Sequence, residues 1–187
     1  MKQLARAQAL IKEGVIGEVE SITLAKKQLG RFLKYDVYTL LGTHCLSMLD
    51  MFLPISECDF SAKPLMGNEG VTTAAIISFE GRNGKCSGYI DLSLHCPARE
   101  TKVTVYGKKG TIIYDPGAVD ALSLICYARS QLEGTNKVNI SSQETYESNE
   151  NHNLQRALAH FSDVIENRVP DNSQRAANIT GITSAFE

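Results

Sequence analysis

The 187 residues suit one domain with a single hydrophobic core, and we expect one domain over residues 1–187. With a formal net charge of -2 and basic residues that gather only into short pairs, the chain shows no nucleic-acid footprint. No apolar run approaches the roughly 18 to 20 residues that cross a bilayer, so we expect a cytoplasmic protein without a membrane partner. The five cysteines include no C-x-x-C pair, which favours free thiols over disulfides or a metal site.

The first two elements have clear signals. Residues 2–13 carry apolar side chains at helical spacing, and Gly14 follows as a plausible C-cap, which predicts an amphipathic helix. Residues 15–29 are rich in β-branched side chains after a glycine turn. They predict a strand with Ile22 and Leu24 on one face.

A second helix is predicted from Asp36, a residue suited to an N-cap, to Pro54, which ends it. Its apolar positions recur at three- and four-residue intervals: Val37, Leu40, Leu41, His44, Met48 and Phe52. At about 100° per residue these positions separate from a polar face, so one side of the helix should be buried. The pattern places His44 inside the apolar arc.

Six short segments with strand character follow, and turns that contain glycine separate several of them: 71–79, 86–95, 101–106, 111–114, 121–128 and 137–140. We expect a mostly antiparallel α+β fold in which the glycine turns at 81–84 and 107–110 are hairpins. Residues 86–95 alternate between a packed face and a polar face. Residues 141–151 are the most polar stretch and predict an exposed loop, and two helices follow, the last one starting at Ser173.

His44 is the strongest candidate for chemistry. A core histidine with satisfied nitrogens and a general acid/base are both open readings of its position, and imidazole suits proton transfer because it titrates near neutral pH. Lys26 and Arg31 precede the helix, and Tyr38 and Thr43 stand beside His44. These four could hydrogen-bond a hydroxylated or carboxylated substrate, although a solvated charged edge is the alternative for the basic residues.

Four stretches together resemble one known family. They are LIKEGVIGEVESI, LLGTHCLSMLDMFL, VTVYGKKGTIIYD and LQRALAHFSDVIENRVPDNSQRAANITGITSAFE. In this order they are similar to the C-terminal domain of the glucose-fructose oxidoreductase and inositol dehydrogenase family. The resemblance implies a large mostly antiparallel mixed sheet with helices packed on one face, and a substrate pocket for a sugar or cyclic polyol. It also implies proton transfer by His44 and a homo-oligomer formed through the exposed sheet face.

In that family a separate Rossmann domain binds NAD or NADP and contributes a lysine. A dinucleotide-binding domain needs a G-x-G turn that opens a helix, and this sequence has none. We therefore expect the 187 residues alone to bind no NAD(P) and to be inactive, as a domain of a longer oxidoreductase. The family often carries an aspartate one turn before the histidine, where this sequence has Leu40. A non-catalytic dimerisation or ligand-binding module derived from the family is the alternative function.

Overall fold

The computed structural model describes residues 2–30, 35–118, 122–132, 135–146, 153–166, 168–171 and 173–186. Its helices are α1 (Lys2–Lys12), α2 (Thr43–Leu49), α3 (Asn153–Ile165) and α4 (Ser173–Ser184). A π-helical turn, η1 (Tyr38–Gly42), leads directly into α2, and a short 3-10 turn, η2 (Ile55–Glu57), follows it. The predicted first and last helices are confirmed.

The strands of the described chain form one eight-stranded sheet in the order β2-β3-β4-β1-β5-β6-β7-β8. Their bounds are β1 (Val19–Leu29), β2 (Cys58–Asn68), β3 (Val71–Gly81), β4 (Ser87–Ser93), β5 (His95–Gly107), β6 (Gly110–Tyr114), β7 (Leu122–Leu132) and β8 (Thr135–Tyr146). β1 runs parallel to β4, and the other neighbouring pairs are antiparallel. The predicted α+β class with a mostly antiparallel mixed sheet is therefore confirmed.

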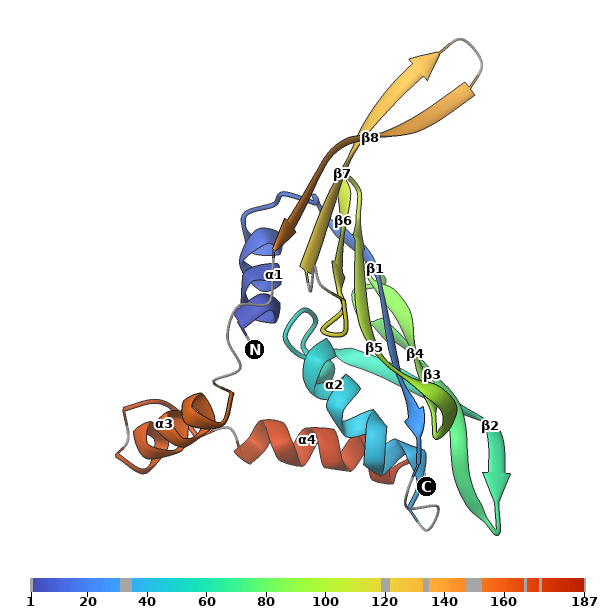
Figure 1. Ribbon diagram of the computed structural model, residues 1–187, viewed down its shortest axis with the longest axis vertical. Coiled ribbons are helices and arrows are strands. Elements are labelled where there is room, and N and C mark those ends of the chain that lie inside the picture. Colours follow the sequence, from blue (N-terminus) through green and yellow to red (C-terminus); the bar gives the residue numbers. More distant parts are fainter. Residues whose placement is uncertain are drawn as a thin grey trace.

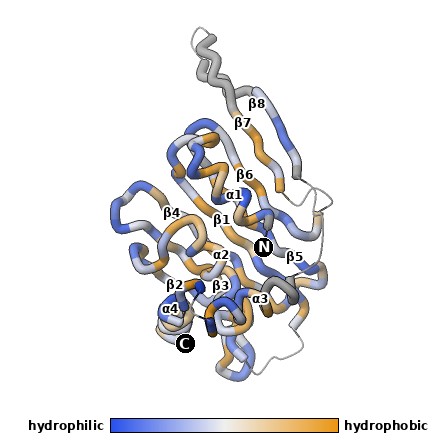
Figure 2. Tube along the Cα trace, turned by 90° about the vertical axis from the view of Figure 1, so that its left-hand side faces the viewer, coloured by the Kyte–Doolittle hydropathy of each residue, from blue (hydrophilic) through white to orange (hydrophobic). Residues whose placement is uncertain are grey.

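The helices lie on one side of the sheet, which we call the covered face (Figure 1). α1 packs over β6, α2 over β1, and α4 against η1 and α2. Because strand side chains alternate, Ile22 and Leu24 of β1 are buried under the helices, while Ser21 and Thr23 point to the opposite, open face. Figure 2 looks from the side of the helices and shows the coloured start of β7 as apolar beside the hydrophilic coloured end of β8.

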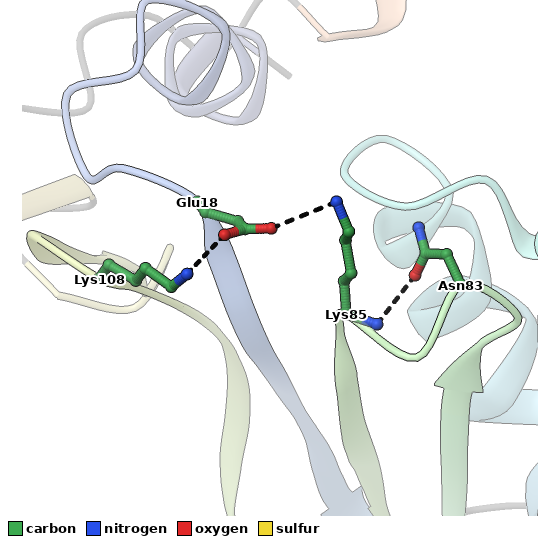
Figure 3. Close-up of polar contacts among 4 residues, drawn as sticks. All are labelled: Glu18, Asn83, Lys85 and Lys108. Atoms are coloured by element: carbon green, nitrogen blue, oxygen red, sulfur yellow. Dashed lines mark hydrogen bonds and ion pairs between the residues drawn. The ribbon is translucent and has the colours of Figure 1, made fainter.

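Both glycine turns are hairpins, as predicted. The turn at 81–84 joins the antiparallel strands β3 and β4, and the turn at 107–110 joins β5 and β6. Glu18, just before β1, links the two turns (Figure 3): it accepts a hydrogen bond from Lys108 at 2.6 Å and pairs with Lys85 at 3.7 Å. The hydrogen bond and charge of Lys108 lower the pKa of Glu18. The start of β1 is thereby fixed against both hairpins.

The structure departs from the predicted strand pattern in two places. β2 lies where no strand was predicted, because Pro64, Gly67 and Asn68 weaken the strand signal. An edge strand tolerates such residues, and register shifts do occur at Pro64 and Met66. The stretch 141–151 was expected to be a loop, but β8 continues to Tyr146 with exposed side chains at 141–145. Pairing with β7 satisfies its backbone without burial of those side chains.

α3 stands away from the rest of the molecule (Figure 1). Two of its apolar residues, Leu158 and Ile165, are 60% and 63% exposed. None of the helices in the described part of the chain is long and apolar enough to cross a membrane.

Candidate functional site

The π-helical turn before α2 determines where His44 lies. Within this turn the backbone N–H of Thr43 donates to the carbonyl of Tyr38, five residues earlier, so the turn is wider than an α-helical one. The helix faces are therefore rotated relative to the predicted α-helical wheel. Cys45, Leu46 and Leu49 are buried, and His44 is exposed. The prediction that His44 lies inside the apolar arc is wrong: the ring lies at the edge of the covered face and is open to solvent.

Asp36 holds the start of this helix in place. One carboxylate oxygen accepts a hydrogen bond from the backbone N–H of Tyr38 at 2.8 Å, and the other accepts one from Thr72 on β3 at 3.1 Å. Both oxygens thus accept hydrogen bonds from backbone N–H groups, and Asp36 does not orient the imidazole. Leu40, at the position where the family often has aspartate, is half-buried and apolar. Among the described residues, no carboxylate forms a hydrogen bond with His44.

Lys26 lies on the covered face of β1, where the buried part of the sheet ends. Leu24 and its partner Val103 on β5 are buried, and the next pair along the same face is Lys26 and Thr101. The ammonium of Lys26 donates a hydrogen bond to the hydroxyl of Thr101 at 3.2 Å. The buried core therefore ends at a polar rim formed by Lys26 and Thr101. α2 packs over β1 and places His44 beside this rim.

Arg99 is a member of this rim that the sequence did not reveal. β1 and β5 pair at Lys27 with Glu100 and again at Leu29 with His95, and β5 has more residues between these pairs than β1 has. The segment from Cys96 to Arg99 therefore bulges out of the ladder, as strands often do beside functional sites. The positive charge of Arg99 acts on Lys26. The only sequence signal was Pro97, which interrupts the strand pattern.

Electrostatics favours the neutral form of the imidazole. Partial burial and, second, the nearby charge of Lys26 lower the pKa of His44 below its ordinary value of 6.5. Burial also lowers the pKa of Lys26, and the Arg99 charge adds to this effect. A neutral imidazole can accept a proton from a hydroxyl, and a nearby cation stabilises the alkoxide that forms. We call His44, Lys26, Thr101 and Arg99 the His44 rim.

The remaining predicted site residues have different outcomes. Tyr38 was expected on the polar edge beside His44, but it is 1% exposed and its ring packs against Phe186 with centroids 5.4 Å apart. That placement is wrong because the wide turn directs this side chain into the core. The hydroxyl of Thr43, next to His44, donates to the carbonyl of Thr39 at 3.0 Å. Arg31 lies outside the described residues.

The described residues do not fit a dinucleotide. Pyrophosphate is usually held where a glycine turn connects a strand to a helix N-terminus. The two glycine turns of this chain connect antiparallel strands, so neither presents a helix N-terminus to a phosphate.

Hollows in the surface occur on the open face, away from His44. One is lined by Ser21, Ser78, Glu80 and Tyr89, and another by Thr23, Tyr89, Lys27 and Tyr106. The second contains the ion pairs of Lys27 with Asp91 and Glu100, so its charges are already compensated. We place the candidate site at the His44 rim, where a titratable base lies beside cations that have no carboxylate partner among the described residues.

No protein-family model matches the sequence, and a comparison with curated proteins finds no match. Solved structures do match. KijD10, a 3-ketoreductase from Actinomadura kijaniata in complex with NADP, has a TM-score of 0.73 at 11% identity over 99% of this chain and 56% of its own. UDP-N-acetylglucosamine 3-dehydrogenase GnnA from Acidithiobacillus ferrooxidans has a TM-score of 0.71 at 14% identity over 96% of this chain and 58% of its own.

WlbA dehydrogenase from Bordetella pertussis, in complex with NADH and UDP-GlcNAcA, has a TM-score of 0.69 at 13% identity and covers 100% of this chain and 57% of its own. The chain thus spans little more than half the length of these structures. At such identities the likeness shows the fold alone: the chain shares its fold with part of NAD(P)-dependent sugar oxidoreductases.

Proposed function

We propose that this chain is the substrate-side domain of an NAD(P)-dependent oxidoreductase that acts on a secondary alcohol of a sugar or cyclic polyol. The observation that carries the proposal is the exposed His44 beside Lys26, on a fold shared with enzymes named as sugar dehydrogenases and ketoreductases. Two of these structures contain NADP or NADH, and a third is named for a nucleotide sugar. NAD or NADP would be held mainly by a Rossmann domain outside these 187 residues.

His44 is the proposed general base. It accepts the hydroxyl proton when the alcohol is oxidised and returns it in the reverse direction. The charge of Lys26 acts on His44. Lys26, Thr43 and Arg31 are the further proposed substrate contacts. Among the described residues no carboxylate bonds to His44, so α2 itself is the proposed support that orients the imidazole.

The test is a substitution in the intact oxidoreductase. His44→Ala should lower the rate about a hundredfold or more, the usual scale for losing a general acid/base. His160→Ala, on α3, is the matched control and should leave the rate within twofold. A loss of less than threefold for His44→Ala contradicts the catalytic role. The isolated chain should show no NAD(P) binding, and micromolar affinity in a titration would contradict the division between domains.

One observation favours a second candidate function, a non-catalytic ligand-binding or dimerisation module. Leu40 stands where the family often has aspartate, and Asp36 is committed to backbone hydrogen bonds. Binding and product formation in the intact protein separate the two candidates, because a non-catalytic module binds its ligand without turnover. If the intact protein binds a sugar and yields no product with either cofactor, the module is the better description.

We further propose a homo-oligomer formed through the open face of the sheet. Tyr89 and Tyr106 are 47% and 42% exposed in the middle of this face, and the neighbouring Lys27 is already paired with Asp91 and Glu100. Exposed aromatic residues are typical of interface centres. The double variant Tyr89→Glu/Tyr106→Glu should sediment as a monomer. Tyr35→Glu, which removes a tyrosine that is even more exposed, at 59%, should not change the oligomer. Equal sedimentation of wild type and double variant excludes this interface.

A further inference from the structure

Two neighbouring lysines of β1 have opposite electrostatic surroundings. Lys27 points to the open face, where its ammonium lies 2.5 Å from a carboxylate oxygen of Asp91 and 3.7 Å from one of Glu100. Lys26 points to the covered face, and its recorded partner is the neutral hydroxyl of Thr101. Among the described residues, no carboxylate lies within ion-pair distance of Lys26. A half-buried ammonium without a counter-charge is costly, because burial removes water and nothing replaces its charge stabilisation.

A second cation lies on the neighbouring strand. Arg99 stands in the bulge at Cys96–Arg99, two residues before the Lys26 partner Thr101, and its charge acts on Lys26. No ion pair of Arg99 with a carboxylate occurs within the described part of the chain either. Two like charges held close together without an acidic partner cost free energy, and an anion between them removes that cost.

We propose, on the basis of the function proposed above, that the substrate of the His44 rim carries an anionic group, a carboxylate or a phosphate ester, which Lys26 and Arg99 bind. The guanidinium of Arg99 offers a planar pair of donors that matches either anion, and Lys26 supplies a point charge. Thr101 holds the Lys26 ammonium in position. His44 then faces a hydroxyl near the bound anion, so charge recognition and proton transfer occupy neighbouring positions on one ligand.

Three sugars with the same ring test this inference with the chain as it exists. Glucose, glucuronate and glucose 6-phosphate differ only at carbon 6, which carries a neutral hydroxymethyl group, a carboxylate or a phosphate ester. Each is titrated at millimolar concentration into the isotope-labelled protein, and binding is followed by the NMR signals of His44 and of the β1 and β5 amides. At least one anionic sugar should bind about tenfold or more tightly than glucose, as expected for charge-assisted hydrogen bonds. The anionic sugar that binds more tightly shows whether the site prefers a carboxylate or a phosphate ester.

Single-charge variants locate the binding groups. Lys26→Gln and Arg99→Gln should each remove most of the preference for the anionic sugar, and Lys27→Gln, one residue away on the other face, should keep it. Arg99 is exposed, so its variant tests the inference even if Lys26→Gln fails to fold. Raising the salt concentration should weaken the anionic ligand more than glucose.

The outcomes are distinct. Equal affinity for all three sugars, or an equal loss in the Lys27 and Lys26 variants, overturns the anionic substrate and leaves the proposed oxidoreductase function standing. Absence of binding by all three sugars counts against the sugar site itself, and the anion inference falls with it.

Discussion

The covered and open faces of the sheet are built from the same strands but differ in how their charges are neutralised. On the open face the charge of Lys27 is paired with Asp91 and Glu100, which raises the pKa of Lys27, chiefly through its hydrogen bond to Asp91. On the covered face burial lowers the pKa of Lys26, and the described residues offer it no carboxylate. Neighbouring residues of one type can thus have opposite roles, because alternation along a strand sends them into different environments.

The covered and open faces also differ in how tightly their side chains pack. The covered face is filled by Ile22, Leu24 and their neighbours under the helices, whereas the open face carries serine, threonine and tyrosine. The covered face should therefore respond to any change of volume, and the open face should tolerate it.

Gly88→Ala should be the most damaging single substitution. A Cβ at Gly88 would lie 1.7 Å from the Ile22 carbonyl oxygen and 2.6 Å from the Phe79 ring, so the β1–β4 pair or the core must shift. We expect a loss of about 4 kcal/mol or more in the free energy of unfolding, measured by chemical denaturation. Gly42→Ala is the control: its Cβ meets Leu92 at an ordinary 3.4 Å within a helical segment, so stability should stay within about 1 kcal/mol of wild type. Equal midpoints for the two variants would show that the covered face is not tightly packed.

Two adjacent residues of β1, Leu24 and Thr23, lie on opposite faces of the sheet. Leu24 is 1% exposed, and Leu24→Ala should cost about 3 kcal/mol through lost burial and the cavity left behind. Thr23 lies on the open face, and Thr23→Ala should cost less than about 1 kcal/mol. Urea denaturation of both variants gives the difference. Similar losses would mean that the open face is as strongly packed as the covered face in solution.

The two lysines should differ in their effect on His44. The pKa of His44 lies below 6.5 because of partial burial and the Lys26 charge, so Lys26→Gln should raise this pKa, and Lys27→Gln should leave it unchanged. An NMR titration of the imidazole measures both. Since the folded state binds this proton less readily than the unfolded chain, His44 lowers stability as the pH falls from about 6.5 through its folded pKa. If Lys27→Gln changes the pKa of His44 as much as Lys26→Gln does, the two charges are not placed as described.

Local patterns predicted much of the fold. The alternation at 86–95 correctly assigned Ile90 and Leu92 to the buried face and Tyr89 to the exposed one, because a strand side chain has only two directions. The hairpin turns were also recognised from their glycines. The parallel contact of β1 with β4 could not be read from the sequence, since it joins segments about sixty residues apart and no local signal specifies it.

The site was predicted less completely than the fold. His44 and Lys26 were chosen as candidates, and the structure brings them into electrostatic contact. Tyr38 was misplaced because an α-helical wheel cannot anticipate a π-helical turn, which depends on the packing of Tyr38 and Leu41 in the core. Arg99 was missed because a bulge in β5, not its place in a periodic pattern, sets its position.

The wide turn before α2 has a consequence for how this protein can vary. Its hydrogen bonds span five residues, whereas those of α2 span four, so deletion of one residue between Tyr38 and Gly42 would allow a continuous α-helix. The wide turn takes up one extra residue, so α2 would keep its present faces after such a deletion. If the five residues instead wound as a regular α-helix without a deletion, everything C-terminal to them would turn by about one residue's angle, roughly 100°. The imidazole would then move away from its present neighbours even though every rim side chain remained in the sequence. The number of residues in this helical turn, as much as their identity, therefore determines which side chains lie beside His44.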